Sequence, residues 1–209
     1  MPPVPDIQSV SVTPSTLYGG QSATGTVTIT TTYPSDIVIT LTSSSPNVIV
    51  PATTTVLAGN LTSNFTVTTT QPTGTATATI TADGLLTPRT CNVTLNKMVA
   101  SAVSVSPSSV SGGSGSTGTV TLVSTAGPSN VVVSLSSSDV HATVPATVTV
   151  TSGNSTANFS VSTTSVGVIT TATITASYGG ASPTATLTIN PPASSYGALC
   201  DTIRVPRGF

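Results

Sequence analysis

The sequence predicts an all-β protein: two tandem β-sandwich domains followed by a short C-terminal tail. Its 209 residues are dominated by strand-favouring types, including 45 threonines, whereas good helix formers are scarce and glutamate is absent. The chain also matches itself after a shift of 93–94 residues. Finally, apolar residues alternate with threonine and serine along short runs, which is the period of a half-buried strand.

The internal match is extensive. The stretch VSVTPSTLYGGQSATGTVTI (10–29) corresponds to VSVSPSSVSGGSGSTGTVTL (103–122). The stretch PATTTVLAGNLTSNFTV (51–67) corresponds to PATVTVTSGNSTANFSV (145–161), with 11 of 17 positions identical. Self-similarity at a fixed spacing indicates a repeated structural unit.

We therefore expect domain 1 over residues 1–97, domain 2 over 98–190, and a tail over 191–209. The seam between the two units, residues 96–101, is short. A connection of this length limits the angle between the domains but does not fix it.

Seven strands are expected in the first unit, because apolar residues occupy alternate positions in seven short runs. In chain order, the inward-facing residues are Val10 and Val12; Val27 and Ile29; Ile37, Ile39 and Leu41; Val48 and Val50; Phe65 and Val67; Ala78, Ile80 and Ala82; Cys91, Val93 and Leu95. Turn residues such as Gly19-Gly20 separate the runs. Seven short strands in about 90 residues are typical of an immunoglobulin-like sandwich, although the Cys–Trp–Cys core of antibody domains is missing.

Three motifs carry a family resemblance: V-S-V-x-P-S-x-V-x-G-G, V-P-A-T-V-T-V-x-x-G and A-T-I-T-A…A-T-L-T-I. These motifs resemble those of bacterial immunoglobulin-like repeats, and the resemblance spans both units, about 180 of the 209 residues. The resemblance implies a module of bacterial surface proteins and adhesins, or of the capsids, tails and fibres of tailed bacteriophages. It implies spacing, stalk building or weak attachment to surface glycans. That family has no catalytic motif, so no catalytic residue is carried over.

Charge and hydropathy argue against two classes of partner. The net charge is −1, with one lysine and three arginines, which is too few cations to neutralise several phosphates of a nucleic acid. No apolar run approaches the roughly 18 residues of a membrane span. The start, MPPVPDIQSV, lacks the pattern of an export signal, so we expect synthesis without one if Met1 is the natural start.

Catalytic, cofactor and metal chemistry are not expected. His141 is the only histidine; Asp139 lies nearby, but no G-x-S-x-G stretch offers a nucleophile, so an exposed loop histidine is expected. The five aspartates are scattered singly through turns, and two distant cysteines with one histidine cannot form a zinc site. A buried thiol at Cys91 and a separate tail thiol at Cys200 are expected rather than a disulfide.

Three tyrosines are candidate surface-contact residues: Tyr18, Tyr33 and Tyr178. A weakly bound surface glycan would need an exposed aromatic ring, and few are present. Tyr18 aligns with Ser111 and Tyr33 with Gly127 or its neighbour, so the fold itself does not require either ring. Packing of a ring at the end of a loop is the alternative.

The tail, PPASSYGALCDTIRVPRGF (191–209), breaks the alternating pattern and has no counterpart after the first unit. It reads as a docking segment for a protein partner in a larger assembly, for example by adding to a sheet edge. The alternatives are a loose end or packing on its own domain. The candidate docking residues are Leu199, Ile203, Arg204, Val205, Arg207 and Phe209.

These observations favour a non-enzymatic protein, with no nucleic-acid partner and no membrane insertion. The main hypothesis is a virion decoration or accessory protein of a tailed bacteriophage, docked on a capsid or tail and displaying its domains. The alternative is a cell-surface or adhesion module of a bacterium, acting as a spacer or weak glycan binder. Because strand edges invite association and few charges oppose it here, self-association is also expected.

Overall fold

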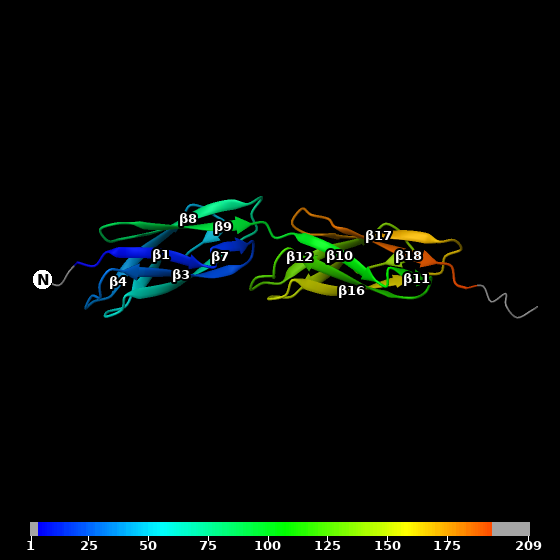
Figure 1. Cartoon of the computed structure of the whole chain (residues 1–209), viewed down its shortest axis with the longest axis horizontal. Helices are drawn as coiled ribbons and strands as arrows, with labels where there is room; N and C mark the ends of the chain where they lie inside the picture. The colour runs from blue at the N-terminus through cyan, green and yellow to red at the C-terminus, as the bar shows by residue number, and fades with distance from the viewer. Residues whose placement is uncertain (1–3, 194–209) are drawn as a thin grey trace, which may run out of the picture.

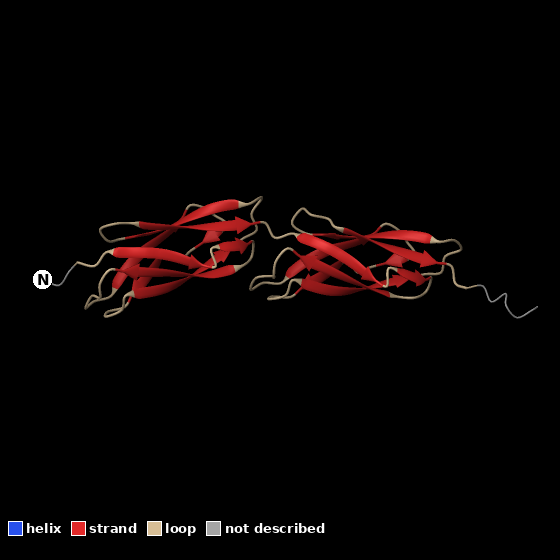
Figure 2. Ribbon diagram, in the orientation of Figure 1, coloured by secondary structure: helices blue, strands red, loops and turns tan. Residues whose placement is uncertain are grey.

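The computed structural model describes residues 4–193, which form two β-sandwiches joined end to end (Figure 1). Within this range all regular structure is β-strand (Figure 2). The prediction of an all-β chain with two immunoglobulin-like sandwiches is therefore confirmed. The second sandwich repeats the strand order of the first.

Domain 1 contains nine strands. They are β1 (Ile7–Thr13), β2 (Thr16–Tyr18), β3 (Ser22–Ile29), β4 (Ile37–Ser43), β5 (Val48–Ile49), β6 (Thr53–Val56), β7 (Thr62–Thr69), β8 (Ala76–Asp83) and β9 (Arg89–Asn96). One sheet has the order β1-β3-β7-β5 and the other β2-β9-β8-β4-β6. The chain leaves the first sheet after β1 and joins the second as β2.

Domain 2 repeats this arrangement. Its strands are β10 (Ala100–Ser106), β11 (Ser109–Ser111), β12 (Ser116–Leu122), β13 (Val131–Ser137), β14 (Ala142–Thr143), β15 (Thr147–Val150), β16 (Thr156–Thr163), β17 (Thr170–Ser177) and β18 (Thr184–Asn190). The sheets have the orders β10-β12-β16-β14 and β11-β18-β17-β13-β15. In both domains the strands pair antiparallel, except that β2 pairs with β9, and β11 with β18, in parallel.

Each domain has a separate core of valine, isoleucine, leucine and alanine with a single phenylalanine, to which Met98 is added in domain 2. Phe65 lies opposite Gly25 in the β3–β7 register, and a Cβ atom on Gly25 would lie 2.1 Å from the ring. Phe159 and Gly118 repeat the arrangement in domain 2. Glycine interrupts these strands because the ring occupies the space of a side chain.

We call the end of each domain where its first strand begins the N-pole, and the opposite end the C-pole. In domain 1 the loops 30–36, 57–61 and 84–88 form the N-pole. The loops 19–21, 44–47 and 70–75 form its C-pole. The C-pole of domain 1 faces the N-pole of domain 2 (Figure 1).

Candidate functional site: the joint between the domains

The joint is built around a short connection between β9 and β10 in which Met98 is fully buried. The Met98 side chain belongs to the hydrophobic core of domain 2. Gln71, from the C-pole of domain 1, binds the main chain of Met98 on both sides. Its Nε2 donates to the Met98 carbonyl, and its Oε1 accepts the Met98 N–H at 3.3 Å. The amide therefore holds the connection in one orientation.

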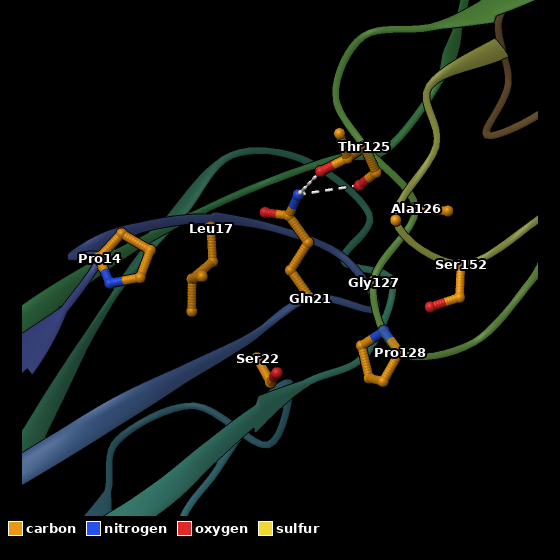
Figure 3. Close-up of a pocket in the computed structure, with 10 residues that line it drawn as sticks. Pro14, Leu17, Gln21, Ser22, Thr125, Ala126, Gly127, Pro128 and Ser152 are labelled. Carbon is orange, nitrogen blue, oxygen red and sulfur yellow. Dashed lines mark hydrogen bonds between the residues drawn. The ribbon is translucent and has the colours of Figure 1, made fainter.

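Gln21 makes the second set of bonds across the joint (Figure 3). Its Nε2 donates to the carbonyl of Thr125 at 2.9 Å and to Oγ of Ser124 at 3.1 Å. Its Oε1 accepts the main-chain N–H of Tyr18 at 2.9 Å. One side chain is thus oriented by domain 1 and bound to domain 2.

Two glycines allow close backbone approaches at the joint: Gly127 between the two domains, and Gly179 against the connection that carries Met98. A Cβ atom on Gly127 would lie 1.9 Å from the carbonyl oxygen of Gly20. A Cβ atom on Gly179, whose φ is +64°, would lie 2.1 Å from the carbonyl oxygen of Met98. Glycine is the residue that permits such contact, and any other side chain at position 127 would push the domains apart.

Gly127 is also a one-residue insertion relative to domain 1. The N–H of Gly59 bonds to the carbonyl of Tyr33, and the equivalent Gly153 bonds to Ala126. Asp36 and Asn130 each accept an N–H from the following turn in the same way. Two residues lie between Tyr33 and Asp36, whereas three lie between the equivalent Ala126 and Asn130. The spacing between equivalent positions of the two domains therefore changes from 93 to 94 residues at this loop.

The three predicted surface tyrosines lie in two places. Tyr18, from domain 1, packs against the core of domain 2, as does Tyr178. Tyr33 packs against the core of domain 1 at the N-pole. All three rings are half-buried rather than fully exposed. The three rings therefore pack at loop ends, which was the alternative to a surface contact. Contact of any of them with a glycan stays a prediction.

The bonding residues of the joint do not recur at the C-pole of domain 2. The N–H of Gly19 bonds to Asn96, and that of Gly112 bonds to Asn190, which sets the correspondence between the two poles. By this correspondence Tyr18, Gln21 and Gln71 are replaced by Ser111, Ser114 and Ser165. Tyr18 stands out in the sequence because domain 2 has serine at the equivalent position. The same difference marks Gln21 and Gln71, which were not predicted as site residues.

An open cleft of about 380 Å³ lies beside these bonds. Residues of both domains line it, including Pro14, Leu17, Gln21, Pro128 and Ser152 (Figure 3). None of the described lining residues is charged or nucleophilic apart from ordinary hydroxyl groups. The cleft is therefore a consequence of how the two poles meet, with no grouping of side chains for chemistry.

His141 and Asp139 lie in the loop 138–141 at the C-pole of domain 2. Asp139 Oδ1 accepts the main-chain N–H of His141 and contacts His141 Nδ1, both at 2.8 Å. These two hydrogen bonds lower the pKa of Asp139. Both contacts shape the loop itself. Over residues 4–193, no cluster of three or more metal-ligating side chains is present.

The remaining predictions concern residues elsewhere in the chain. Cys91 is half-buried against the core of domain 1, and burial raises the pKa of its thiol. Across the described range no helix has the length and apolar character needed to cross a membrane. The proposed docking residues Leu199, Ile203, Arg204, Val205, Arg207 and Phe209 lie outside the described residues, as does Cys200.

Fold and joint together define a tandem immunoglobulin-like protein. No known family profile matches the chain, and no curated protein matches it. Among solved structures, it is similar to the D0-D1 domain of intimin, with 11% identity, a TM-score of 0.36, and coverage of 90% of this chain and 100% of that one. It is also similar to the adhesin InvE of Yersinia pseudotuberculosis, with 19% identity and a TM-score of 0.39.

The InvE match covers 87% of this chain and 58% of the InvE chain. A chimeric titin Z1Z2 is similar at 13% identity and a TM-score of 0.36, with coverage of 90% of this chain and 98% of that one. These similarities are too distant to carry an argument about function.

Proposed function

We propose that this chain is a non-enzymatic spacer that holds two immunoglobulin-like domains end to end within a larger surface assembly. The joint is the observation that carries the proposal. Gln21 and Gln71 reach from one domain to the other, while domain 2 has serine at both equivalent positions. Two domains joined by a flexible linker, with no fixed orientation, would not need these two side chains.

The contacts at the joint are strong enough to hold the two domains in one orientation. Each neutral hydrogen bond contributes about 0.5–1.5 kcal/mol. Packing of the Tyr18 ring against the core of domain 2 adds part of the roughly 1.5–3 kcal/mol that full burial of a large apolar side chain contributes. The covalent connection keeps the two poles at high effective concentration, so a few such contacts are enough to favour one orientation.

The setting that we favour is the bacterial cell surface, as a spacer module of an adhesion or surface protein. The repeat motifs that resemble bacterial immunoglobulin-like modules support it. So does the end-to-end arrangement, which places the two outer poles far apart (Figure 1). In this role the chain distances whatever is attached at one end from whatever is attached at the other, and Tyr33 is a candidate for weak glycan contact.

A virion decoration protein is the second candidate. The specific observation in its favour is the tail, 191–209, which has no counterpart after domain 1 and follows the last strand, β18. A segment of this kind suits docking onto a capsid or tail protein. Deleting 194–209 and measuring co-sedimentation with virions and with cell envelopes tests both settings. Loss of binding to virions alone would favour the second candidate.

The spacer itself is tested by giving domain 1 the residues of domain 2: Tyr18→Ser, Gln21→Ser and Gln71→Ser together. Small-angle scattering of the dilute protein should show a broader distribution of interatomic distances than in the wild type. The melting transition of domain 1 should change little, because none of these side chains lies in its core. Domain 2 loses the packing of the Tyr18 ring, so its melting transition should fall slightly while it stays folded. The control is Thr24→Ser, Thr66→Ser and Thr68→Ser, on exposed positions of domain 1.

An unchanged scattering profile in the triple joint variant would show that these residues do not hold the domains, and the spacer proposal would fail.

A further inference from the structure

The outer N-pole of the molecule carries exposed apolar side chains on the loops of domain 1. Leu57 is 56% exposed, Leu61 is 44% exposed and Leu86 is 73% exposed. Val4, which is 64% exposed, precedes β1 at the same pole. Asp6 ties the segment before β1 to the loop 84–88, because its Oδ1 accepts the N–H groups of Ile7 and Thr87. The loop 57–61 is held separately, because Asp36 Oδ1 accepts the N–H of Ala58 and the carbonyl of Leu57 accepts the N–H of Asn60. The leucines therefore sit on loops whose backbone is held in place.

The outer C-pole, on domain 2, is also apolar. Val140 is 86% exposed, Val168 is 73% exposed and Ile169 is 67% exposed. Val140 belongs to the loop 138–141, which the Asp139 hydrogen bonds shape, and the other two belong to the loop 164–169. Surfaces of this kind on soluble proteins commonly mark contact sites.

The two poles that meet inside the molecule lack these apolar side chains. At the N-pole of domain 2, the positions of Leu57, Leu61 and Leu86 hold Thr151, Ser155 and Gly180. At the C-pole of domain 1, the positions of Val140, Val168 and Ile169 hold Pro46, Gly74 and Thr75. At these six positions the duplicated domain therefore differs: the outer poles carry large exposed aliphatic side chains, whereas the inner joint has threonine, serine, glycine or proline.

This difference has a physical reason. At the inner joint the covalent connection supplies proximity, so the hydrogen bonds from Gln21 and Gln71 and the packing of one ring, Tyr18, suffice to set the orientation. Two separate molecules must overcome the loss of translational and rotational freedom, which usually requires buried apolar surface. An apolar N-pole and an apolar C-pole are what a pole-to-pole contact without a covalent connection would need.

We infer that copies of this chain associate head to tail, with the N-pole of domain 1 in one copy seated on the C-pole of domain 2 in another. The occupant is a second copy because the inner joint already shows a C-pole of this fold seated on an N-pole of the same fold. The N-pole carries three carboxylates, Asp6, Asp36 and Asp83, each of which accepts a backbone N–H of its own domain, and the C-pole carries one, Asp139. A contact between unlike poles at opposite ends of the chain leaves one free pole at each end of the assembly, so it propagates into a filament unless its rotation closes a ring.

The test replaces apolar side chains at each outer pole with the residues that occupy the equivalent positions at the inner joint. The N-pole variant is Leu57→Thr with Leu61→Ser, and the C-pole variant is Val168→Gly with Ile169→Thr. In sedimentation velocity at rising concentration, the wild-type full chain should form a series of growing species. Each variant alone should remain monomeric, with the association at least about tenfold weaker.

Mixing the two variants distinguishes the head-to-tail contact from other contacts. The N-pole variant keeps an intact C-pole and the C-pole variant an intact N-pole, so an equimolar mixture should form a dimer and stop there. The matched control is Ile49→Thr with Val132→Thr, two exposed aliphatic side chains on strands β5 and β13, at the ends of the domains that face the inner joint rather than at the outer poles, which should associate like the wild type. Thermal melts of all variants establish that each is folded.

Several results would overturn the inference. A wild type that stays monomeric at every concentration would do so. Association that persists in the C-pole variant but not in the N-pole variant would indicate a symmetric contact between two N-poles. Association that is lost on deletion of 194–209 while both poles are intact would make the tail the occupant. None of these outcomes bears on the orientation of the inner joint, so the spacer proposal is tested separately.

Discussion

At the scale of single residues, each core depends on an aromatic ring laid over a glycine. Phe159 is 6% exposed and its ring occupies the space beside Gly118, as Phe65 does beside Gly25. The glycine has no side chain to fill that space if the ring is removed. Because neither domain has a tryptophan, nearby aliphatic side chains would have to collapse into the gap.

Phe159→Ala should therefore destabilise domain 2 by about 3–5 kcal/mol. Denaturant unfolding of the whole chain, compared with Ser160→Ala on the exposed face of the same strand, measures the loss. A near-neutral Phe159→Ala would mean that the ring is not the centre of this core.

A second residue-scale prediction concerns acid. Partial desolvation opposes ionisation of Asp6, but hydrogen bonds from Thr87 and Ile7 and the charge of Arg89 outweigh it and lower the pKa of this carboxyl. A folded-state pKa below the unfolded value of about 3.9 gives stability that is present above that pH and lost as pH falls through the folded pKa.

Asp6→Asn should remove this dependence. Melting temperatures of wild type and variant should differ at neutral pH and converge as the solution is acidified below about pH 3.9. A constant difference across that range would contradict the assignment.

At the scale of elements, the joint depends on the loop between β12 and β13. Gly127→Ala places a methyl group where the carbonyl of Gly20 lies, so the two poles must separate and the Gln21 bonds to Thr125 must break. Residual dipolar couplings should then fit separate alignment tensors for the two domains, whereas the wild type should fit one. Gly74→Ala is the control, because its Cβ would meet nothing within 4 Å.

The strands show how far periodicity can lead. Alternation predicts the seven runs with two or more inward-facing residues, but not β2 or β6 in domain 1. β2 is only three residues long, with Leu17 as its one buried residue, so it has no period to detect. β6 is mostly threonine and is recognised by its pairing with β4 rather than by apolar residues.

The joint was less predictable than the strands for a different reason. Gln21 and Gln71 lie in turns, where polar residues are ordinary, and only the geometry shows that they face another domain. The role of Gly127 could not be predicted, because a one-residue insertion leaves it open whether Tyr33 aligns with Gly127 or with its neighbour. Comparison of the two units at each position is the signal that would have exposed all three.

At the scale of the whole molecule, the scarcity of charge has a measurable effect. The hydrogen bonds across the joint join neutral groups, and the outer poles are apolar, so neither depends on ion pairs. The scattering profile of the dilute protein should be the same at low and high salt, since screening acts on charges. A shape that opens with added salt would reveal an electrostatic contribution that the joint residues do not account for.

The parallel pairing of β2 with β9 determines how a domain bears tension. Three residue pairs, Thr16–Thr94, Leu17–Leu95 and Tyr18–Asn96, join a strand near the start of domain 1 to its last strand. A pull on the two ends of the chain slides these strands past each other, so their hydrogen bonds must yield together. A hairpin pulled at its open end parts one bond at a time.

Single-molecule stretching from the chain ends should accordingly need more force than stretching between cysteine handles at Thr75 and Asn96, at the open end of the β8–β9 hairpin. Equal forces would contradict this. A module with this geometry resists load along the direction in which it extends and yields readily to load across it.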